Sequence, residues 1–413
     1  MQPRDPLLSR LAPRDQALLR ITFDGTSYIH RFVLGPEHAN SLINHLFVSF
    51  NASPDALLGV FLACSGRFSS KFRLSAYTDV NLDYSNCARA VQSLREMADT
   101  ASIKTPDLVT VLTLGLGIVT FDLLETGMYA HSISRHTLTL ADRHLCLSTV
   151  YPRQRARIME DVGPNLLPLV LMDTYNCLVR RQVPIMRLQL QNTETVDKYI
   201  GVCWPLMPHL YDICCLSCRI SSLPSATPGQ KLEGGLPLDI TQGLDVVETA
   251  LHSWHPSIPA RTMRSSTARE VEILETQANI YKSAILLVIH RLRHPLGHED
   301  ETAWEWSCII LAGIERLLSV AARTPDGHTA LGQESNFDYR LAFPFFVAAV
   351  EVADPIERAA VLDKLSSVVS AELYSHVLGM MRRAIVHIWG NRDEDSGSYL
   401  LDIISEGPPL VLF

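Results

Sequence analysis

The amino-acid sequence predicts an all-α protein, built as a large array of packed antiparallel helices joined by long loops. From residue 38 onward, apolar residues recur at the spacing of one helix face. Proline followed by an acidic residue, as at Pro54-Asp55 and Pro106-Asp107, marks helix starts between these runs. Hydrophobic residues make up 47% of the 413 positions and charged residues 19%, which allows a sizeable core and excludes general disorder.

We interpret residues 1–37 as an N-terminal arm. Residues 13–19 form a short capped helix in this interpretation. Residues 21–33 are rich in β-branched and aromatic side chains and contain an Asp24-Gly25 turn signal. This stretch predicts either a small hairpin or an extended arm.

Residues 38–413 are expected to form one continuous helical domain. The Pro-, Gly- and Ser-rich stretch 221–243 predicts a long loop between two helical halves. Residues 324–336 and 391–398 are further loop candidates. In the first half, helices are predicted over 40–51, from 54, over 84–98, from 105, over 130–145 and over 163–179. Their candidate core residues include Leu42, Ile43, Leu46, Phe47, Ala56, Leu57, Val60, Phe61, Cys64, Ala88, Val91, Leu94 and Met97.

The second half is organised around a helical hairpin at residues 276–318. Residues 284–289 are apolar on every side, which predicts a helix buried all round. Pro295 and Gly297 end this helix, and acidic residues at 299–301 begin the returning one. We expect Leu287 to contact helices of both halves, and Arg293 to bridge the halves through a buried carboxylate. The predicted buried face of the returning helix comprises Trp304, Ile309, Ile310, Ile314, Leu317 and Leu318.

The hairpin also carries a family resemblance. Residues 278–297 have the form A-x-I-Y-x-x-A-x-L-L-x-I-H-R-L-R-x-P-x-G, which resembles the fungal-specific transcription factor domain, the regulatory region of fungal zinc-cluster transcription factors. Residues 107–140, 197–216 and 343–358 resemble other helices of that family. The resemblance implies a nuclear regulator that acts through protein contacts, with the transcription machinery or a DNA-binding co-regulator. It also implies an effector held between helices and control of a metabolic gene cluster, and it allows a homodimer.

Charge and cysteine content bear on DNA binding. The formal net charge of −8 argues against a broad nucleic-acid-binding surface. The nine cysteines are odd in number and mostly lie in apolar runs, which predicts reduced core thiols inside a cell. The zinc-cluster finger of the resembled family needs clustered cysteines among Lys and Arg, and no window provides them. We therefore expect no direct DNA binding from this chain alone, unless an upstream finger is missing from it.

No catalytic, cofactor-binding or metal-binding residue is predicted. Gly115 and Gly117 lack the strand-turn-helix context of a dinucleotide site and are interpreted as close helix-packing positions. Cys215 and Cys218, beside Cys214, lack the second ligand pair that a structural zinc requires.

Three histidines at the hairpin, His290, His294 and His298, are spaced by four residues. Arg291 stands where a zinc hydrolase helix carries Glu, and Pro295 breaks the helix that would align the rings. We expect His290 to pack and hydrogen-bond at the hairpin, and Arg291 and Arg293 to pair with carboxylates or helix C-terminal carbonyls.

Two further polar stretches are candidates for chemistry. The stripe on the helix at 130–145 is interpreted as a solvated or inter-helix salt-bridging face, because no nucleophile accompanies it. Its members are His131, Arg135, His136, Asp142, Arg143 and His144. The arginines at 153, 155 and 157 are weak evidence for a phosphate contact.

The sequence predicts neither a secretory signal nor a membrane span. Charged residues interrupt the N-terminus, and the longest apolar run, residues 108–121, is shorter than the ~20 residues of a membrane span. The alternative function is a helical metabolic enzyme or ligand-binding protein with an unrecognised site, which acid/base pairs in a buried pocket would favour.

Overall fold

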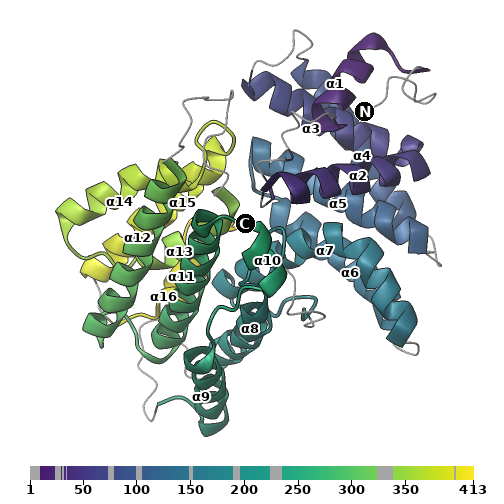
Figure 1. The fold of residues 1–413 in the computed structure, drawn as a ribbon. Helices are drawn as coiled ribbons and strands as arrows, with labels where there is room; N and C mark the ends of the chain where they lie inside the picture. Colours follow the sequence, from purple (N-terminus) through teal and green to yellow (C-terminus); the bar gives the residue numbers. More distant parts are fainter. Residues whose placement is uncertain are drawn as a thin grey trace. The chain divides into compact units, whose positions relative to one another are not determined.

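The all-α prediction is confirmed. The computed structural model describes residues 10–23, 29, 32–33, 35–72, 79–98, 105–147, 152–188, 196–223, 235–322, 338–394 and 397–413. Within these ranges the chain forms sixteen α-helices and no strand, apart from an isolated bridge between Asp197 and Gly201 (Figure 1).

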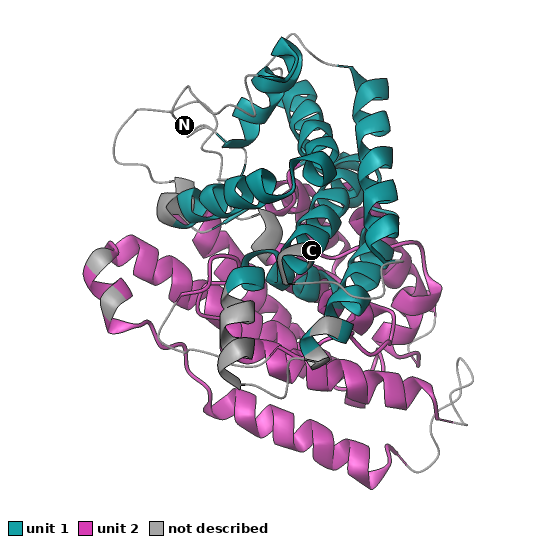
Figure 2. Ribbon diagram, turned by 90° about the vertical axis from the view of Figure 1, so that its right-hand side faces the viewer, with its two compact units in different colours: residues 1–173, 371–377 teal, residues 174–370, 378–413 magenta. Residues whose placement is uncertain are grey.

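The chain folds as two compact units, coloured separately in Figure 2. Unit 1 comprises residues 1–173 and 371–377, and unit 2 comprises residues 174–370 and 378–413. Boundaries between the units fall inside α7 (Pro152–Val179) and α15 (Ser375–Glu394), whereas the predicted loop 221–243 lies within unit 2. This loop prediction extends too far, because residues 238–243 belong to α9 (Leu238–Ser253).

The helices of unit 1 are α1 (Pro13–Phe23), α2 (Gly35–Ala52), α3 (Pro54–Phe72), α4 (Val80–Ala98), α5 (Thr105–Glu125), α6 (Ala130–Leu147) and α7 (Pro152–Val179) as far as residue 173. The helices of unit 2 are α8 (Met207–Ser221), α9 (Leu238–Ser253), α10 (Ala260–Ser265), α11 (Ala268–Arg293), α12 (Asp300–Ala322), α13 (Asp338–Ala349), α14 (Pro355–Val368), most of α15 (Ser375–Glu394) and α16 (Leu400–Glu406).

Helix α5 forms the centre of unit 1, where it packs against α2, α3, α4 and α6. Its two glycines permit this close packing. A Cβ at Gly115 would lie 2.3 Å from Thr137 on α6, and a Cβ at Gly117 would lie 2.4 Å from Val60 on α3. The packing interpretation of these glycines is therefore confirmed.

The same helix corrects the prediction that no apolar segment is long enough for a membrane span. Among the described residues, Leu108–Glu125 is long and apolar enough to cross a membrane, because α5 extends beyond the apolar run seen in the sequence. Of this segment, 67% is buried inside the protein. Burial of that kind is typical of a core helix, which passes the same length and composition test.

Helix α11 is the central helix of unit 2, in contact with α8, α9, α12, α13 and α16. Thr267 and Glu270 begin it with a reciprocal capping box. Residues 284–289 are each at most 3% exposed, as predicted, and Leu287 is fully buried. Because α8 precedes the 221–243 stretch and α12 follows it, α11 contacts both halves of the sequence. Figure 1 shows α11 and α12 side by side.

Some predicted helix faces were wrong. Ile309 is 51% exposed, while Ile310, Ile314 and Leu317 are buried. Adjacent positions on a helix point about 100° apart, so only one of two neighbouring isoleucines faces the core. In α4 the predicted Ala88 is exposed. The buried side of α4 instead comprises Asp83, Asn86, Cys87, Ala90 and Leu94.

The N-terminal hairpin is also corrected in part. Residues 21–23 form the last turn of α1 rather than a strand. Phe23 packs there against the rings of Phe47, Phe50 and Phe61, with centroid separations of 5.3–5.8 Å. Burial of this aromatic side chain favours the helix over the β propensity of its neighbours.

The Asp24-Gly25 turn signal and the loop candidate 324–336 lie outside the described residues. Residues 391–394 belong to α15.

Candidate functional site

The turn between α11 and α12 positions a cluster of charged side chains of unit 2 that are joined by hydrogen bonds. Helix α11 ends at Arg293, before Pro295. Gly297 follows with φ of 84°, a left-handed conformation that glycine adopts without strain, and this confirms its predicted role. Glu299 also has a positive φ, 51°. The tight turn brings the start of α12 back beside the last turn of α11.

Arg291 is the buried centre of this region, with a side chain that is 0% exposed. Its Nε and Nη2 donate to the two carboxylate oxygens of Glu351 at 2.7 and 2.6 Å. Nη2 also donates to Asp300 Oδ1 at 2.6 Å. Nη1 donates to the carbonyls of Pro295 and His298 at 3.2 and 3.1 Å. All five donors of the guanidinium are therefore satisfied, which is the condition for burying such a charge at tolerable cost.

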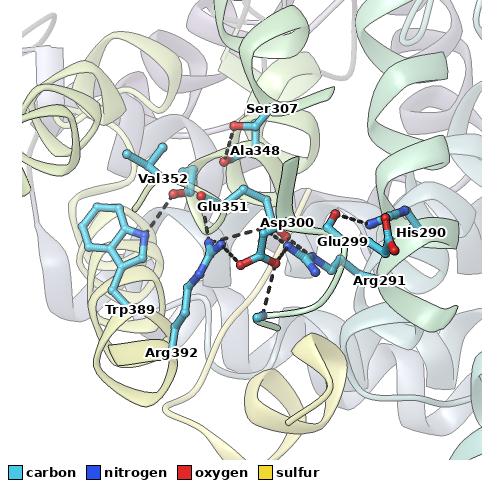
Figure 3. Close-up of polar contacts among 12 residues, drawn as sticks. His290, Arg291, Glu299, Asp300, Ser307, Ala348, Glu351, Val352, Trp389 and Arg392 are labelled. Carbon is cyan, nitrogen blue, oxygen red and sulfur yellow. Dashed lines mark hydrogen bonds and ion pairs between the residues drawn. The ribbon is translucent and has the colours of Figure 1, made fainter. Parts of the chain in front are cut away.

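A second arginine completes the network (Figure 3). Arg392, on α15, donates to Asp300 Oδ2 at 2.7 Å and lies 3.4 Å from a carboxylate oxygen of Glu351. Two arginines thus face two carboxylates, so the formal charges balance. Although burial opposes ionisation of Asp300, hydrogen bonds from Arg291 and Arg392 lower its pKa. Likewise, burial opposes the charge of Arg291, but hydrogen bonds to Glu351 and Asp300 raise its pKa.

The network also satisfies the buried C-terminal end of α13. The last carbonyls of a helix have no partner within the helix. Here the amides of Glu351 and Val352 donate to the carbonyls of Ala348 and Ala349. Side chains from three other helices add donors to these two carbonyls and to those of the two residues whose amides they accept from. Ser307 donates to Ala348 O at 2.8 Å, Trp389 to Ala349 O at 3.1 Å, Arg392 to Glu351 O at 2.8 Å, and Arg358 to Val352 O at 2.9 Å. Two of these donors are cations, which the negative end of the helix dipole favours.

The buried bridge between the two halves of the sequence that was expected of Arg293 is not formed by this residue. The buried ion pairs are those of Arg291, and their carboxylates, Asp300 and Glu351, lie in the same half as Arg291. Arg293 is 25% exposed and pairs with Asp245 and Glu248 of α9, at 2.7 and 2.9 Å. Asp245 is 54% exposed, so this ion pair is close to solvent. The two arginines are two positions apart on α11, and their side chains therefore point to different sides of the helix. The broader expectation that both arginines pair with carboxylates or carbonyls is confirmed.

The histidines of the hairpin lie beside the network. His290 Nε2 is 3.0 Å from the carbonyl of Glu299, which confirms its predicted hydrogen bond across the turn. The rings of His290 and His294 are 4.7 Å apart. Burial lowers the pKa of both histidines, and the nearby positive charge of Arg291 adds to this. His298 contributes its carbonyl to Arg291.

In unit 1, part of the polar stripe of α6 forms an inter-helix ion-paired face and part is solvated, so both options that the sequence left open occur. His131 Nε2 and Arg135 Nη1 both lie 3.1 Å from Asp173 Oδ1 on α7. Ser134 donates to the carbonyl of Leu169 at 2.8 Å. His136 and Arg143 are exposed on the same helix, and the side chain of His144 lies outside the described set, as do those of the arginines at 153–157.

Most of the described cysteines are core thiols, as the sequence predicts, but Cys308 on α12 is exposed. Among the described cysteines, five are buried thiols outside any disulfide: Cys64, Cys87, Cys177, Cys203 and Cys214. Cys214 lies 3.5 Å from the carbonyl of Thr174, while Cys215 and Cys218 are half-buried. Burial raises the pKa of Cys215, which disfavours its thiolate.

Sequence reasoning found Arg291 as a pairing residue but missed Glu351 and Arg392. Glu351 lies 60 residues from Arg291 along the chain. No local pattern links two residues so far apart, and a single Glu after an apolar helix gives no signal of its own. The network therefore has a structural role. Its hydrogen bonds and ion pairs hold the α11–α12 turn, the end of α13 and helix α15 against one another.

The comparisons with known proteins point to one family. The sequence matches the fungal specific transcription factor domain over residues 30–413, nearly the whole chain. The comparisons with curated proteins and with solved structures gave no match. The match includes α11, α12, α13 and α15, which contribute the charged network. The chain belongs to the fungal specific transcription factor domain family, and this membership supports a role in the regulation of transcription.

Proposed function

We propose that this chain is the regulatory region of a nuclear transcription regulator, and that it acts through contacts with other proteins rather than through chemistry. The family match over residues 30–413 is the observation that carries this proposal. The network around Arg291 supports it, because its side chains are used to hold helices together. A regulator of this kind needs a helical body whose shape determines which partners bind.

In this proposal the charged network determines the shape of unit 2. Glu351 and Asp300 each bind both arginines, so releasing one member weakens contacts made by the other three. Such a coupled group favours one arrangement of the helices over intermediate ones. An effector or a partner protein would act by preferring one arrangement.

A tethering experiment tests the proposal. The full chain is fused to an unrelated DNA-binding domain and assayed on a reporter gene in a fungal host. We expect the fusion to change reporter expression relative to the DNA-binding domain alone. Arg291→Met should abolish the change, whereas Arg293→Ala should preserve it, because Arg293 lies outside the buried network. An unchanged reporter, with the fusion present in the nucleus, would contradict the proposal.

The regulated genes are a second part of the proposal. We propose that they form a metabolic gene cluster, as the family resemblance implies. Deletion of the encoding gene followed by transcript profiling tests this. Neighbouring metabolic genes should change together, and scattered changes among unrelated genes would count against it.

A further inference from the structure

Helix α8 carries two thiols on its partly exposed side. Cys215 and Cys218 are both half-buried, whereas the adjacent Cys214 is buried and lies 3.5 Å from the carbonyl of Thr174. Tyr211, Cys215 and Cys218 follow one another at intervals of four and three residues, which is the spacing of a single helix face. A small molecule from solvent can therefore reach both thiols together.

The surroundings of Cys215 keep its thiol protonated. Burial raises the pKa of Cys215, and the charges of Asp212 and Cys218 add to this. A hydrogen bond from Tyr211 and the charge of Arg187 oppose the rise. The effect of Cys218 is that of a neighbouring sulfur atom on the same helix face. The pair is thus a dithiol rather than a dithiolate.

Zinc fits this pair poorly. A structural zinc ion takes four ligands and binds cysteine as the thiolate, so the raised pKa of Cys215 opposes it. Asp212 lies three residues before Cys215 and offers a carboxylate on the same helix. Its two oxygens already accept hydrogen bonds from Arg187, at 3.0 and 2.9 Å. A suitable ligand must therefore be satisfied by two sulfur atoms.

A disulfide between the two thiols is disfavoured by their spacing. Side chains three residues apart on a helix have Cβ atoms about 5–6 Å apart, whereas a disulfide requires about 3.5–4.5 Å. Closing a disulfide between Cys215 and Cys218 would therefore distort α8. A single atom bonded to both sulfur atoms spans the longer separation without that distortion.

We propose that Cys215 and Cys218 form a binding site for trivalent arsenicals, in which one arsenic atom bridges the two sulfur atoms. With arsenous acid, two S–H bonds and two As–OH bonds break, two As–S bonds form, and two water molecules leave. The third arsenic substituent is retained, so the three-coordinate arsenic needs no further ligand from the protein. No atom changes its oxidation state, and both thiol protons leave in the water. The site does not depend on the proposed function.

Binding of a probe to the native full chain tests the proposal. The probe is phenylarsine oxide, whose arsenic carries one phenyl group and bonds to two thiols with loss of one water molecule. With the protein kept reduced by a phosphine, intact-protein mass spectrometry should show one probe bound per chain. The probe should withstand an excess of 2-mercaptoethanol and be removed by 2,3-dimercaptopropanol, because only a second dithiol matches the chelate. Sodium arsenite should compete with the probe.

Single substitutions identify the two thiols. Cys215→Ser and Cys218→Ser should each weaken binding at least about 100-fold, because the second As–S bond of the native site forms within one molecule. Two matched controls should bind as the native chain does: Cys214→Ser, at a buried thiol beside the pair, and Cys308→Ser, at an exposed thiol on α12. Calorimetric titration gives the dissociation constants, and circular dichroism checks that each variant is folded.

Thiol mapping in the native chain gives a second readout that needs no variant. The bound probe should protect Cys215 and Cys218 together from iodoacetamide and leave Cys308 reactive. Protection of a different pair, binding that survives either substitution, or release by 2-mercaptoethanol would each overturn the proposal. So would stoichiometric closure of a Cys215–Cys218 disulfide by dilute peroxide, because the spacing argument would then fail. These measurements concern binding by purified protein, so their failure is separate from failure of the reporter assay.

Discussion

At the scale of single residues, two buried charges determine how the protein responds to substitution and to pH. Arg291 lies in unit 2 and has all its donors satisfied by carboxylates and carbonyls. Asp83 lies in unit 1, where Gly66 leaves room for it: a Cβ at that glycine would lie 2.1 Å from Asp83 Oδ1. Both positions are sensitive because a buried charge cannot be hydrated when its partner is removed.

Replacement of Arg291 should be strongly destabilising. Arg291→Met leaves Glu351 buried without its bidentate partner, and we expect a loss of about 3–5 kcal/mol in the free energy of unfolding. Arg291→Met combined with Glu351→Met should cost less than the single variant, since both charges are then gone. Arg293→Ala is the matched control: its ion pairs are close to solvent and should contribute about 1 kcal/mol or less. Denaturant melts compare the variants, and equal losses at the two arginines would refute the assignment.

The raised pKa of Asp83 predicts that the free energy of unfolding depends on pH. Burial raises the pKa of Asp83 from 3.8 to about 6, against the opposing effect of Arg14 and Arg67 and with a small contribution from Asp79. Because the folded-state pKa is raised, the proton stabilises the folded state. This contribution is complete below pH 3.8 and is lost as the pH rises through about 6. Its size is at most about 3 kcal/mol, because each tenfold change in proton affinity corresponds to ~1.4 kcal/mol.

The substitution Asp83→Asn checks this expectation. The variant has no titrating group at this site, so its stability should change less than that of the native chain between about pH 4 and about pH 7. The measurement is the denaturant midpoint of each protein at both pH values. An identical pH dependence in the two proteins would rule out Asp83 as the responsible group.

At the scale of elements, the hairpin of α11 and α12 contains apolar side chains that are fully buried and others that are exposed, and their substitution should affect stability differently. Leu287 is 0% exposed on a helix that contacts five others in unit 2. Leu287→Ala should therefore cost about 2–5 kcal/mol through lost burial and a residual cavity. Ile309→Ala, on the partner helix, should stay within about 0.5 kcal/mol because Ile309 is 51% exposed. Denaturant melts measure both, and a Leu287→Ala protein as stable as the parent would contradict the central role of α11.

At the scale of the whole molecule, charge determines which partners the polypeptide can bind. The formal net charge is −8, and duplex DNA binding requires clustered cations that neutralise phosphates. We expect no sequence-specific duplex binding by this polypeptide alone at about 0.15 M salt. Anisotropy titrations with promoter fragments check this. Nanomolar binding that weakens steeply with salt would show that a basic surface exists.

The sequence by itself determined the features that depend on neighbouring residues. The uninterrupted apolar stretch at 284–289 predicted a buried helix, and the proline and glycine after it predicted the turn. Glycine spacing in α5 predicted close helix packing. The same reasoning failed at Ile309 and Ala88, because a stretch with apolar residues on several faces does not show which face meets the core.

Only the tertiary structure decided which distant residues meet. Arg291 and Glu351 are 60 residues apart, and Asn176 and Leu412 are 236 apart. Many acidic residues could pair with either arginine of α11, and which one does depends on the rotation of the helix and on the position at which α13 ends. Local periodicity determines the helices, whereas ion pairs and the contacts of residues 408–413 depend on packing between helices, and no short-range pattern encodes them.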